Sequence, residues 1–205
     1  MSIGSLGFHA RFEYKYLLTD FHAEELRRVL AYHMELDKYC ALATEKKYLN
    51  TSLYFDSHNY HCYHSAATGE KNRFKLRARW YTGQIGEPLF LEEKRRTTDV
   101  IAKSRVRIRP EALRETLAGR PLEADSVVEE GPGCAAEGIR LLDKLERLRA
   151  RPACYVRYYR QAWVSPEHSY LRVTLDTALQ GHRPQAEPAP LDSQGWLQAG
   201  DGRTI

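Results

Sequence analysis

The sequence predicts an α+β fold with a large antiparallel β-sheet and helices packed outside it. Segments with strict alternation of apolar and polar residues recur along the chain. Turn-forming stretches such as ThrGlyGlnIleGlyGlu at 82–87 separate them, and a few longer segments have helical spacing instead. Strands joined mostly by short turns pair antiparallel, so we expect one hairpin-rich sheet.

The composition fits one soluble domain with a real core. The chain has 205 residues, of which 42% are hydrophobic and 28% charged, which excludes disordered, collagen-like and disulfide-rich chains. No apolar run is long enough for a membrane span, and the first residues lack a secretory signal pattern. The four cysteines include no Cys-x-x-Cys pair, which argues against a zinc ribbon. We therefore expect a cytoplasmic protein with no membrane segment in this chain.

Seven segments alternate as strands with one buried face do. They are Arg11 to Leu18, Lys47 to Phe55, Arg73 to Tyr81, Pro88 to Arg96, Val100 to Arg109, Cys154 to Val164 and Ser169 to Asp176. Three helices fit between them, at Asp20 to about Tyr39, Pro110 to Ala118 and Ala135 to about Arg149. The second helix has proline at its first position and Gly119 just past its end, which is the expected order of start and stop signals.

Charged side chains gather on one face of the predicted sheet, because residues two apart along a strand share a face. The third segment shows the pattern well, since its cations alternate with apolar residues from Phe74 to Trp80. Over all strands, this face holds the cations Lys15, Lys75, Arg77, Arg79, Lys94, Lys103, Arg105, Arg107, Arg160 and Arg172, and the carboxylates Glu13, Glu92 and Asp176.

This imbalance points to a ligand with several negative charges. For any single strand a plain solvated face is the simpler explanation, but directly opposed like charges repel, and the strands taken together weaken that explanation. If the sheet curls into a barrel with this face inside, low-dielectric walls strengthen the field. Arginine favours bidentate contacts to phosphate oxygens, and the few carboxylates suit Mg or Mn.

Seven short motifs follow one another along the chain. They are RFEYKY at 11–16, NTSLYFDS at 50–57, KLRARWY at 75–81, FLEEKRR at 90–96, KSRVR at 103–107, YVRYYRQAW at 155–163 and RVTLDTAL at 172–179. In these motifs the sequence resembles the VTC domain family, the polyphosphate polymerase domain of the triphosphate tunnel metalloenzyme (CYTH-like) superfamily, over nearly its whole length. The resemblance implies an antiparallel β-barrel whose basic interior holds a triphosphate or polyphosphate chain beside a divalent metal. It also implies transfer of the γ-phosphoryl group of ATP to polyphosphate.

The resemblance and the charge pattern together predict the site residues. We expect catalytic roles for Lys15, Arg77, Arg79, Lys94 and Arg160. We expect further phosphate binding by Arg11, Lys75, Lys103, Arg105, Tyr158 and Arg172. The expected ligands of Mn or Mg are Glu13, Glu92 and Asp176.

Two other functions stay open within the same fold. Relatives with this tunnel hydrolyse tripolyphosphate or nucleoside triphosphates, where a carboxylate positions water, and Glu13 is the candidate unless it binds the metal or only partners Arg11 or Lys15. The family's last tunnel strand, with its Glu-x-Lys pair, would begin where this sequence ends. We therefore expect residues 1–205 to form a single tunnel domain that stops before that strand, which would suit a binding module that holds polyphosphate or another polyanion without turnover.

Two further signals are weaker. The stretch SHNYHCYH contains His58, His61, Cys62 and His64, residue types that suit zinc, but an exposed helical turn is the favoured interpretation. The Tyr-rich stretch at 155–160 could stack nucleic-acid bases, yet no RNA-binding motif accompanies it. We expect no nucleic-acid partner, and the sequence does not predict the oligomeric state.

Overall fold

The computed structural model describes residues 13–128, 131, 133–168, 170–184, 195–199 and 203–205. Within these residues the strands are β1 (Glu35–Leu36), β2 (Tyr48–Asp56), β3 (Asn72–Trp80), β4 (Phe90–Thr97), β5 (Val100–Ile108), β6 (Val127–Val128), β7 (Arg151–Val164), β8 (Arg172–His182) and β9 (Leu197–Gln198). The α-helices are α1 (Asp20–His33), α2 (Lys38–Leu42), α3 (His61–Ala67), α4 (Pro110–Leu117) and α5 (Cys134–Arg147), and Ala124–Ser126 forms a 3₁₀ turn.

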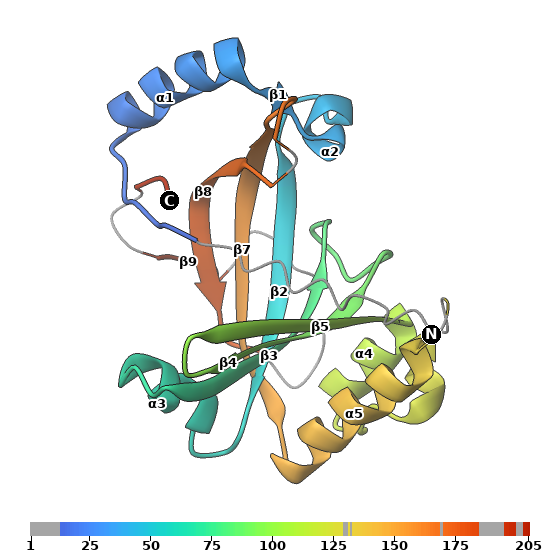
Figure 1. The fold of residues 1–205 in the computed structure, drawn as a ribbon. Coiled ribbons are helices and arrows are strands. Elements are labelled where there is room, and N and C mark those ends of the chain that lie inside the picture. The colour runs from blue at the N-terminus through green and yellow to red at the C-terminus, as the bar shows by residue number, and fades with distance from the viewer. Residues whose placement is uncertain (1–12, 129–130, 132, 169, 185–194, 200–202) are drawn as a thin grey trace, which may run out of the picture.

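All nine strands belong to one antiparallel sheet, which confirms the predicted α+β class (Figure 1). Hydrogen-bonded neighbours run in the order β6-β5-β4-β3-β2-β7-β8-β9, and β1 pairs with the end of β7. The sheet twists strongly, so that β3, β4 and β5 run across the direction of β2, β7 and β8 in Figure 1. Within the described residues the sheet is open, with β6 and β9 at its edges, which agrees with the expected tunnel barrel that lacks its last strand.

The predicted first strand, Arg11 to Leu18, is the main correction to the strand assignment. Arg11 lies outside the described residues, and residues 13–17 have no strand assignment. Leu18 alone forms a bridge, with two backbone hydrogen bonds to Thr204 of 2.8 and 3.1 Å. Ile205 in turn exchanges backbone hydrogen bonds with Asp176 on β8. A strand requires a neighbour that pairs along its length, and this segment has one only at Leu18 among the residues that the structure describes.

The first predicted helix is also shorter than its pattern suggests. α1 ends at His33, and Met34 takes extended backbone angles (φ −138°, ψ 159°). The next two residues pair with β7 as β1, and Asp37 then caps α2 by accepting a hydrogen bond from the Cys40 backbone N–H at 2.9 Å. Strand pairing and the Asp37 cap thus override a helical pattern that the sequence alone extends to Tyr39.

The other predicted elements are confirmed with shifted ends. β8 differs most, since it starts at Arg172 and continues to His182 in place of Ser169 to Asp176. The helices predicted from Pro110 and Ala135 correspond to α4 and α5. The two-residue strands β1, β6 and β9 were not predicted, because segments so short carry no readable alternation.

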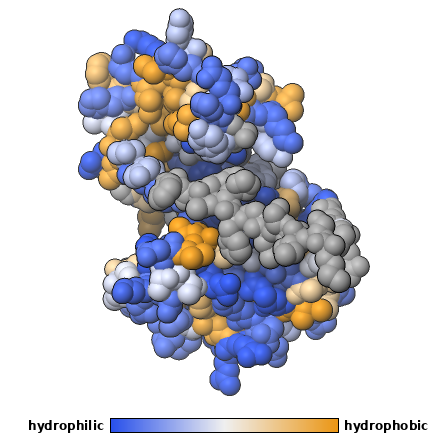
Figure 2. All heavy atoms as spheres, viewed as in Figure 1, coloured by the Kyte–Doolittle hydropathy of each residue, from blue (hydrophilic) through white to orange (hydrophobic). Residues whose placement is uncertain are grey.

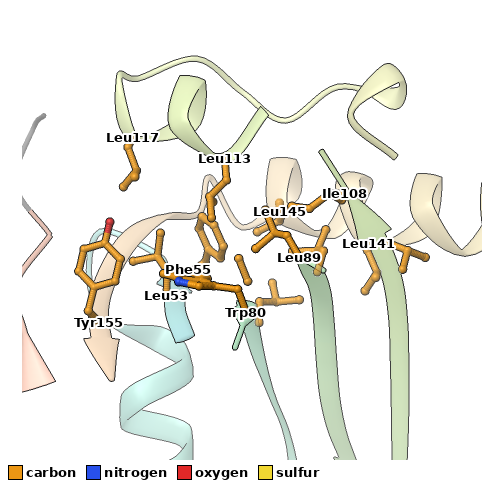
Figure 3. Packing of buried hydrophobic residues seen from close by; sticks show 14 residues of the cluster. Leu53, Phe55, Trp80, Leu89, Ile108, Leu113, Leu117, Leu141, Leu145 and Tyr155 are labelled. Carbon is orange, nitrogen blue, oxygen red and sulfur yellow. The ribbon is translucent and has the colours of Figure 1, made fainter. Parts of the chain in front are cut away.

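One face of the sheet packs against α4 and α5 to form the main core (Figure 3). Leu113 and Leu117 come from α4, and Leu141 and Leu145 come from α5. They meet strand residues such as Trp80, which is completely buried. Because successive side chains on a strand point to opposite faces, this core leaves the other face of β3, β4 and β5 for the charged residues.

A smaller core anchors α1 on the same face of the sheet, near its other end. Leu30 of α1 packs with Trp163 of β7 and Leu175 of β8. α1 also exposes Phe21 and Tyr32, and hydrophobic residues gather on this upper part of the molecule in Figure 2. Among the described residues, no helix is both long and apolar enough to cross a membrane.

Leu141→Ala should lower the free energy of unfolding by about 2–5 kcal/mol, because it removes a fully buried side chain and leaves a cavity between α5 and the sheet. Urea denaturation measures the change. Ile139→Ala on the same helix is the matched control, since Ile139 is 60% exposed and should change the free energy of unfolding far less. Equal losses in the two variants would contradict this assignment of the core.

Candidate functional site

The strand register places the predicted cations on one face, which we call the charged face. Arg77 lies opposite Glu92, and Glu92 lies opposite Arg105 across the next strand pair. Lys75, Lys94 and Lys103 line up one level further along the same three strands. β3 also pairs with β2, where Ser52 lies opposite Arg79 and Tyr54 lies opposite Arg77. The alternation seen in the sequence thus becomes a continuous surface across β2 to β5.

Glu92 is the centre of this face and is 1% exposed. Arg77 contacts its Oε2 twice, from Nε at 2.8 Å and from Nη2 at 2.7 Å, and Arg79 Nε lies 3.9 Å from the same oxygen. Lys103 Nζ and Arg105 Nε lie 3.1 and 3.5 Å from Oε1. Four cations therefore converge on a single carboxylate, with a surplus of three positive charges.

These contacts determine how Glu92 and Lys103 titrate. Burial by itself raises the pKa of Glu92, but the charges of Arg77, Arg79 and Lys103 outweigh burial and hold its pKa at about 2. Burial lowers the pKa of Lys103, and the attraction of Glu92 opposes this shift only in part. Glu92 is thus ionised at neutral pH. Its single negative charge does not neutralise the four cations around it, so these cations still attract further anions.

Uncharged groups hold the arginine side chains in place. Arg77 Nη1 donates to the Tyr54 hydroxyl at 3.2 Å, and Arg79 donates to Ser52 Oγ at 3.4 Å. Arg79 Nη2 also lies 3.5 Å from the hydroxyl of Tyr158, a residue that the sequence predicts for phosphate binding. The supporting residues Ser52 and Tyr54 were missed by the charge pattern, although they stand on the same alternating face of the motif NTSLYFDS.

A second ion pair lies further along the face, between β7 and β8. Arg160 donates to both carboxylate oxygens of Asp176, at 2.7 Å each. The same guanidinium carbon stands 5.2 Å from the centre of the Tyr158 ring. Arg172, also on β8, instead donates to Asp37 before α2 at 2.6 Å. Arg160 and Arg172 are thus already paired with carboxylates, unlike the surplus cations around Glu92.

The N-terminal segment reaches the charged face through Glu13. Glu13 Oε2 accepts a hydrogen bond from Lys94 at 3.0 Å, and Lys15 Nζ lies 3.6 Å from Oε1. The hydrogen bond from Lys94 lowers the pKa of Glu13, with burial as an opposing influence. The predicted residues Glu13, Lys15 and Lys94 are therefore brought together without a paired first strand.

The three predicted metal ligands do not form a shared site. Glu92 contacts four cations, Asp176 is held by Arg160, and Glu13 is held by Lys94. Within the described part of the chain, no group of three or more His, Cys, Asp or Glu side chains is placed to hold a metal. A divalent ion needs several oxygen ligands at one point, and these three carboxylates are each paired with different cations, so this arrangement does not fit a metal bound by the protein alone.

Among the described residues, the side chains of the histidine-rich stretch are likewise not grouped to hold a metal. His58, His61 and His64 are exposed on and before α3, as the exposed helical turn predicted from the sequence requires. Cys62 is buried, and burial raises its pKa to about 12. Its backbone N–H donates to Asp56 at 2.8 Å, so this stretch serves to fix α3 after β2.

Comparison with known proteins identifies the family of the chain. The model of the VTC domain matches residues 10–202. A proposed adenylate cyclase from Bacillus halodurans shares 12% identity, with a TM-score of 0.44, over 80% of this chain and 69% of that chain. A proposed adenylyl cyclase from Hippeastrum, described as having a dominant triphosphatase activity, shares 14% identity, with a TM-score of 0.43, over 81% of this chain and 70% of that chain.

Glu92→Gln should flatten the loss of stability on acidification. The carboxyl has a pKa of about 2 when folded against 4.5 as its ordinary value, so its contribution of roughly 3 kcal/mol is present above pH 4.5 and is lost as the pH falls towards 2. Urea unfolding at several pH values between 5.5 and 2.5 measures this dependence. Glu25→Gln, at an exposed carboxylate that pairs with Arg28 on the same helix, should leave the wild-type dependence intact.

If Glu92→Gln kept the same slope as the wild type, Glu92 would not be the centre of the ion network.

Proposed function

This chain belongs to the VTC domain family, and from that membership we propose that it binds a triphosphate or polyphosphate chain along the charged face. We further propose that it transfers the γ-phosphoryl group of ATP to the end of a polyphosphate chain, as the family resemblance implies. The first proposal concerns only the ligand, whereas the second specifies the reaction.

The convergence of Arg77, Arg79, Lys103 and Arg105 on Glu92 is the observation that supports this proposal most. All four cations lie at neighbouring positions on β3 and β5, so their charges repel one another when no anion other than Glu92 is present. Phosphate oxygens supply the missing negative charge in a geometry that a guanidinium can bind with two hydrogen bonds. A chain of phosphates suits the row better than a single phosphate, because Lys75 and Lys94 extend it along the strands.

The proposed reaction needs positioning and charge stabilisation more than a side-chain nucleophile. A terminal phosphate oxygen of the acceptor chain attacks the γ-phosphorus, the bond from that phosphorus to the β–γ bridging oxygen breaks, and ADP leaves with the bonding electrons. Arg77 and Arg79 would hold the transferring group, because their side chains are fixed by Tyr54 and Ser52. The negative charge that develops on the equatorial oxygens would be stabilised by the surplus cations without their having to reorganise.

Hydrolysis in the same site is the second candidate, and Glu13 is the observation that favours it. Its side chain is 54% exposed, and its lowered pKa keeps it ionised beside Lys94. An ionised carboxylate next to a phosphate-binding lysine can orient a water molecule for attack. Glu13→Gln would then reduce release of free phosphate more than it reduces binding of the triphosphate.

Incubation of the purified chain with ATP and Mn or Mg tests the reaction. We expect ATP loss to be matched by ADP and by polyphosphate on a gel, with little free phosphate. Free phosphate without polymer would identify the hydrolase. Tight binding of tripolyphosphate with neither product would identify a binding module and contradict phosphoryl transfer by this chain.

Arg77→Ala and Arg79→Ala should each weaken polyphosphate binding by on the order of 1.5–3 kcal/mol, the typical range for a hydrogen bond to a charged group. Isothermal titration with tripolyphosphate measures the loss. Arg95→Ala is the matched control, because Arg95 is an exposed arginine on β4 whose register puts it on the opposite face.

Arg77→Lys keeps a charge opposite Glu92 and serves where the alanine variant loses stability. Similar affinities for the wild type and the variants at Arg77 and Arg79 would exclude the charged face as the binding site.

A further inference from the structure

Four aromatic rings form a row at one end of the charged face, and we call them the aromatic row. Tyr39 of α2, Tyr48 at the start of β2, Tyr81 just after β3 and Phe90 at the start of β4 follow one another in space. Successive ring centroids are 6.1, 6.0 and 6.4 Å apart, with edge-to-face geometry. Tyr39 is 59% exposed and the other three are half-buried, so parts of their ring surfaces remain accessible.

The aromatic row continues directly into the cationic centre. Tyr81 is two residues beyond Arg79, and Phe90 is two residues before Glu92, which corresponds to about 6.6 Å along each strand on the same face. Arg105 joins the two regions, because its guanidinium carbon lies 3.4 Å from the Phe90 ring centroid and its Nη2 donates to the Tyr81 hydroxyl at 3.1 Å. The same side chain stands 3.5 Å from Glu92 Oε1. An elongated ligand that is aromatic at one end and anionic along the rest matches this order.

Asn50 provides an independent sign of a polar ligand at the junction. It stands two residues after Tyr48 and two before Ser52, and across the sheet it lies opposite Tyr158. Asn50 is 1% exposed, yet neither its amide nitrogen nor its amide oxygen has a hydrogen-bond partner within the part of the chain that the structure describes. Leaving such a group unpaired costs about 1–3 kcal/mol, a cost that a polar ligand group can relieve.

We propose that the aromatic row binds the nucleobase of a nucleoside triphosphate, so that the sugar lies near Asn50 and the phosphates extend over the cations around Glu92. This inference rests on the proposed function and adds to it the residues that bind the base and a direction of binding. Aromatic stacking of a base tolerates different bases, because every base has a π-face. The site would therefore distinguish a nucleoside triphosphate from inorganic tripolyphosphate more strongly than one base from another.

Tyr81→Ala tests the proposal when ATP and inorganic tripolyphosphate are titrated side by side. We expect the affinity for ATP to fall roughly 5- to 100-fold and the affinity for tripolyphosphate to change less than about twofold. Tyr81→Phe keeps the ring but removes the hydroxyl that Arg105 contacts, and should retain more affinity for ATP than Tyr81→Ala does. Tyr32→Ala removes a tyrosine of α1 that is 85% exposed and does not belong to the aromatic row, and should change neither affinity.

The outcomes separate this inference from the proposed function. Equal weakening of ATP and tripolyphosphate by Tyr81→Ala, or no weakening of ATP, would overturn the nucleobase site while leaving the polyanion site intact. Absence of binding of both ligands by the wild-type chain would overturn the proposed function and this inference together.

If Tyr81→Ala fails to fold, Tyr39→Ala at the exposed end of the row and saturation-transfer NMR on adenine protons with the wild type give the same decision.

Asn50→Leu adds a readout that a purely structural role would not give. The variant removes the unpaired amide but keeps its approximate volume, so we expect an unchanged or higher Tm. We also expect weaker ATP binding without a matching loss for tripolyphosphate. A lower Tm with equal losses for both ligands would show that Asn50 supports the sheet and makes no contact with the nucleoside.

Discussion

The arrangement of the charged face depends on one buried carboxylate. Without Glu92, the guanidinium groups of Arg77 and Arg79 and the ammonium group of Lys103 would face one another with no negative charge between them. Removing one partner from a buried ion network is costly because the remaining charges stay uncompensated. Glu92 therefore allows the cations to be assembled before any ligand arrives, and the surplus charge that it leaves is what remains for binding.

Contacts on the opposite face of the same strands stabilise this arrangement. Leu91 and Glu93 flank Glu92 on β4 and point away from it, towards α5. Glu93 is itself buried, and it pairs with Arg140 and Lys144 of α5. Glu92 and Glu93 thus point to opposite faces of β4. Glu93 forms ion pairs with α5, and Glu92 forms ion pairs with the cations of the charged face. The helix contact fixes β4, and β4 fixes Glu92.

Much of the site could be predicted from the sequence because alternation fixes which side chains share a face. The positions of Arg77, Arg79 and Lys94 follow from this rule, and the register confirms that they lie on one surface. Closure of the sheet could not be read in the same way, since the pattern from Arg11 to Leu18 does not reveal whether a paired neighbour exists. Alternation also assigns Glu92, and not Glu93, to the cation face, but it does not reveal that Glu92 is buried among four cations or that Glu93 pairs with α5.

The aromatic row escaped prediction for a different physical reason. Tyr48, Tyr81 and Phe90 stand at strand ends, where aromatic residues are common in cores and turns alike, and their shared position depends on the register of three strands. Arg105 connects the aromatic row to the charged face, because its side chain contacts Phe90, Tyr81 and Glu92. A ligand that displaced Arg105 from the ring of Phe90 would also alter the charge next to Glu92. In the proposed complex, binding at the aromatic end and binding at the anionic end would therefore be coupled through Arg105, which would favour ligands that occupy the two ends at once.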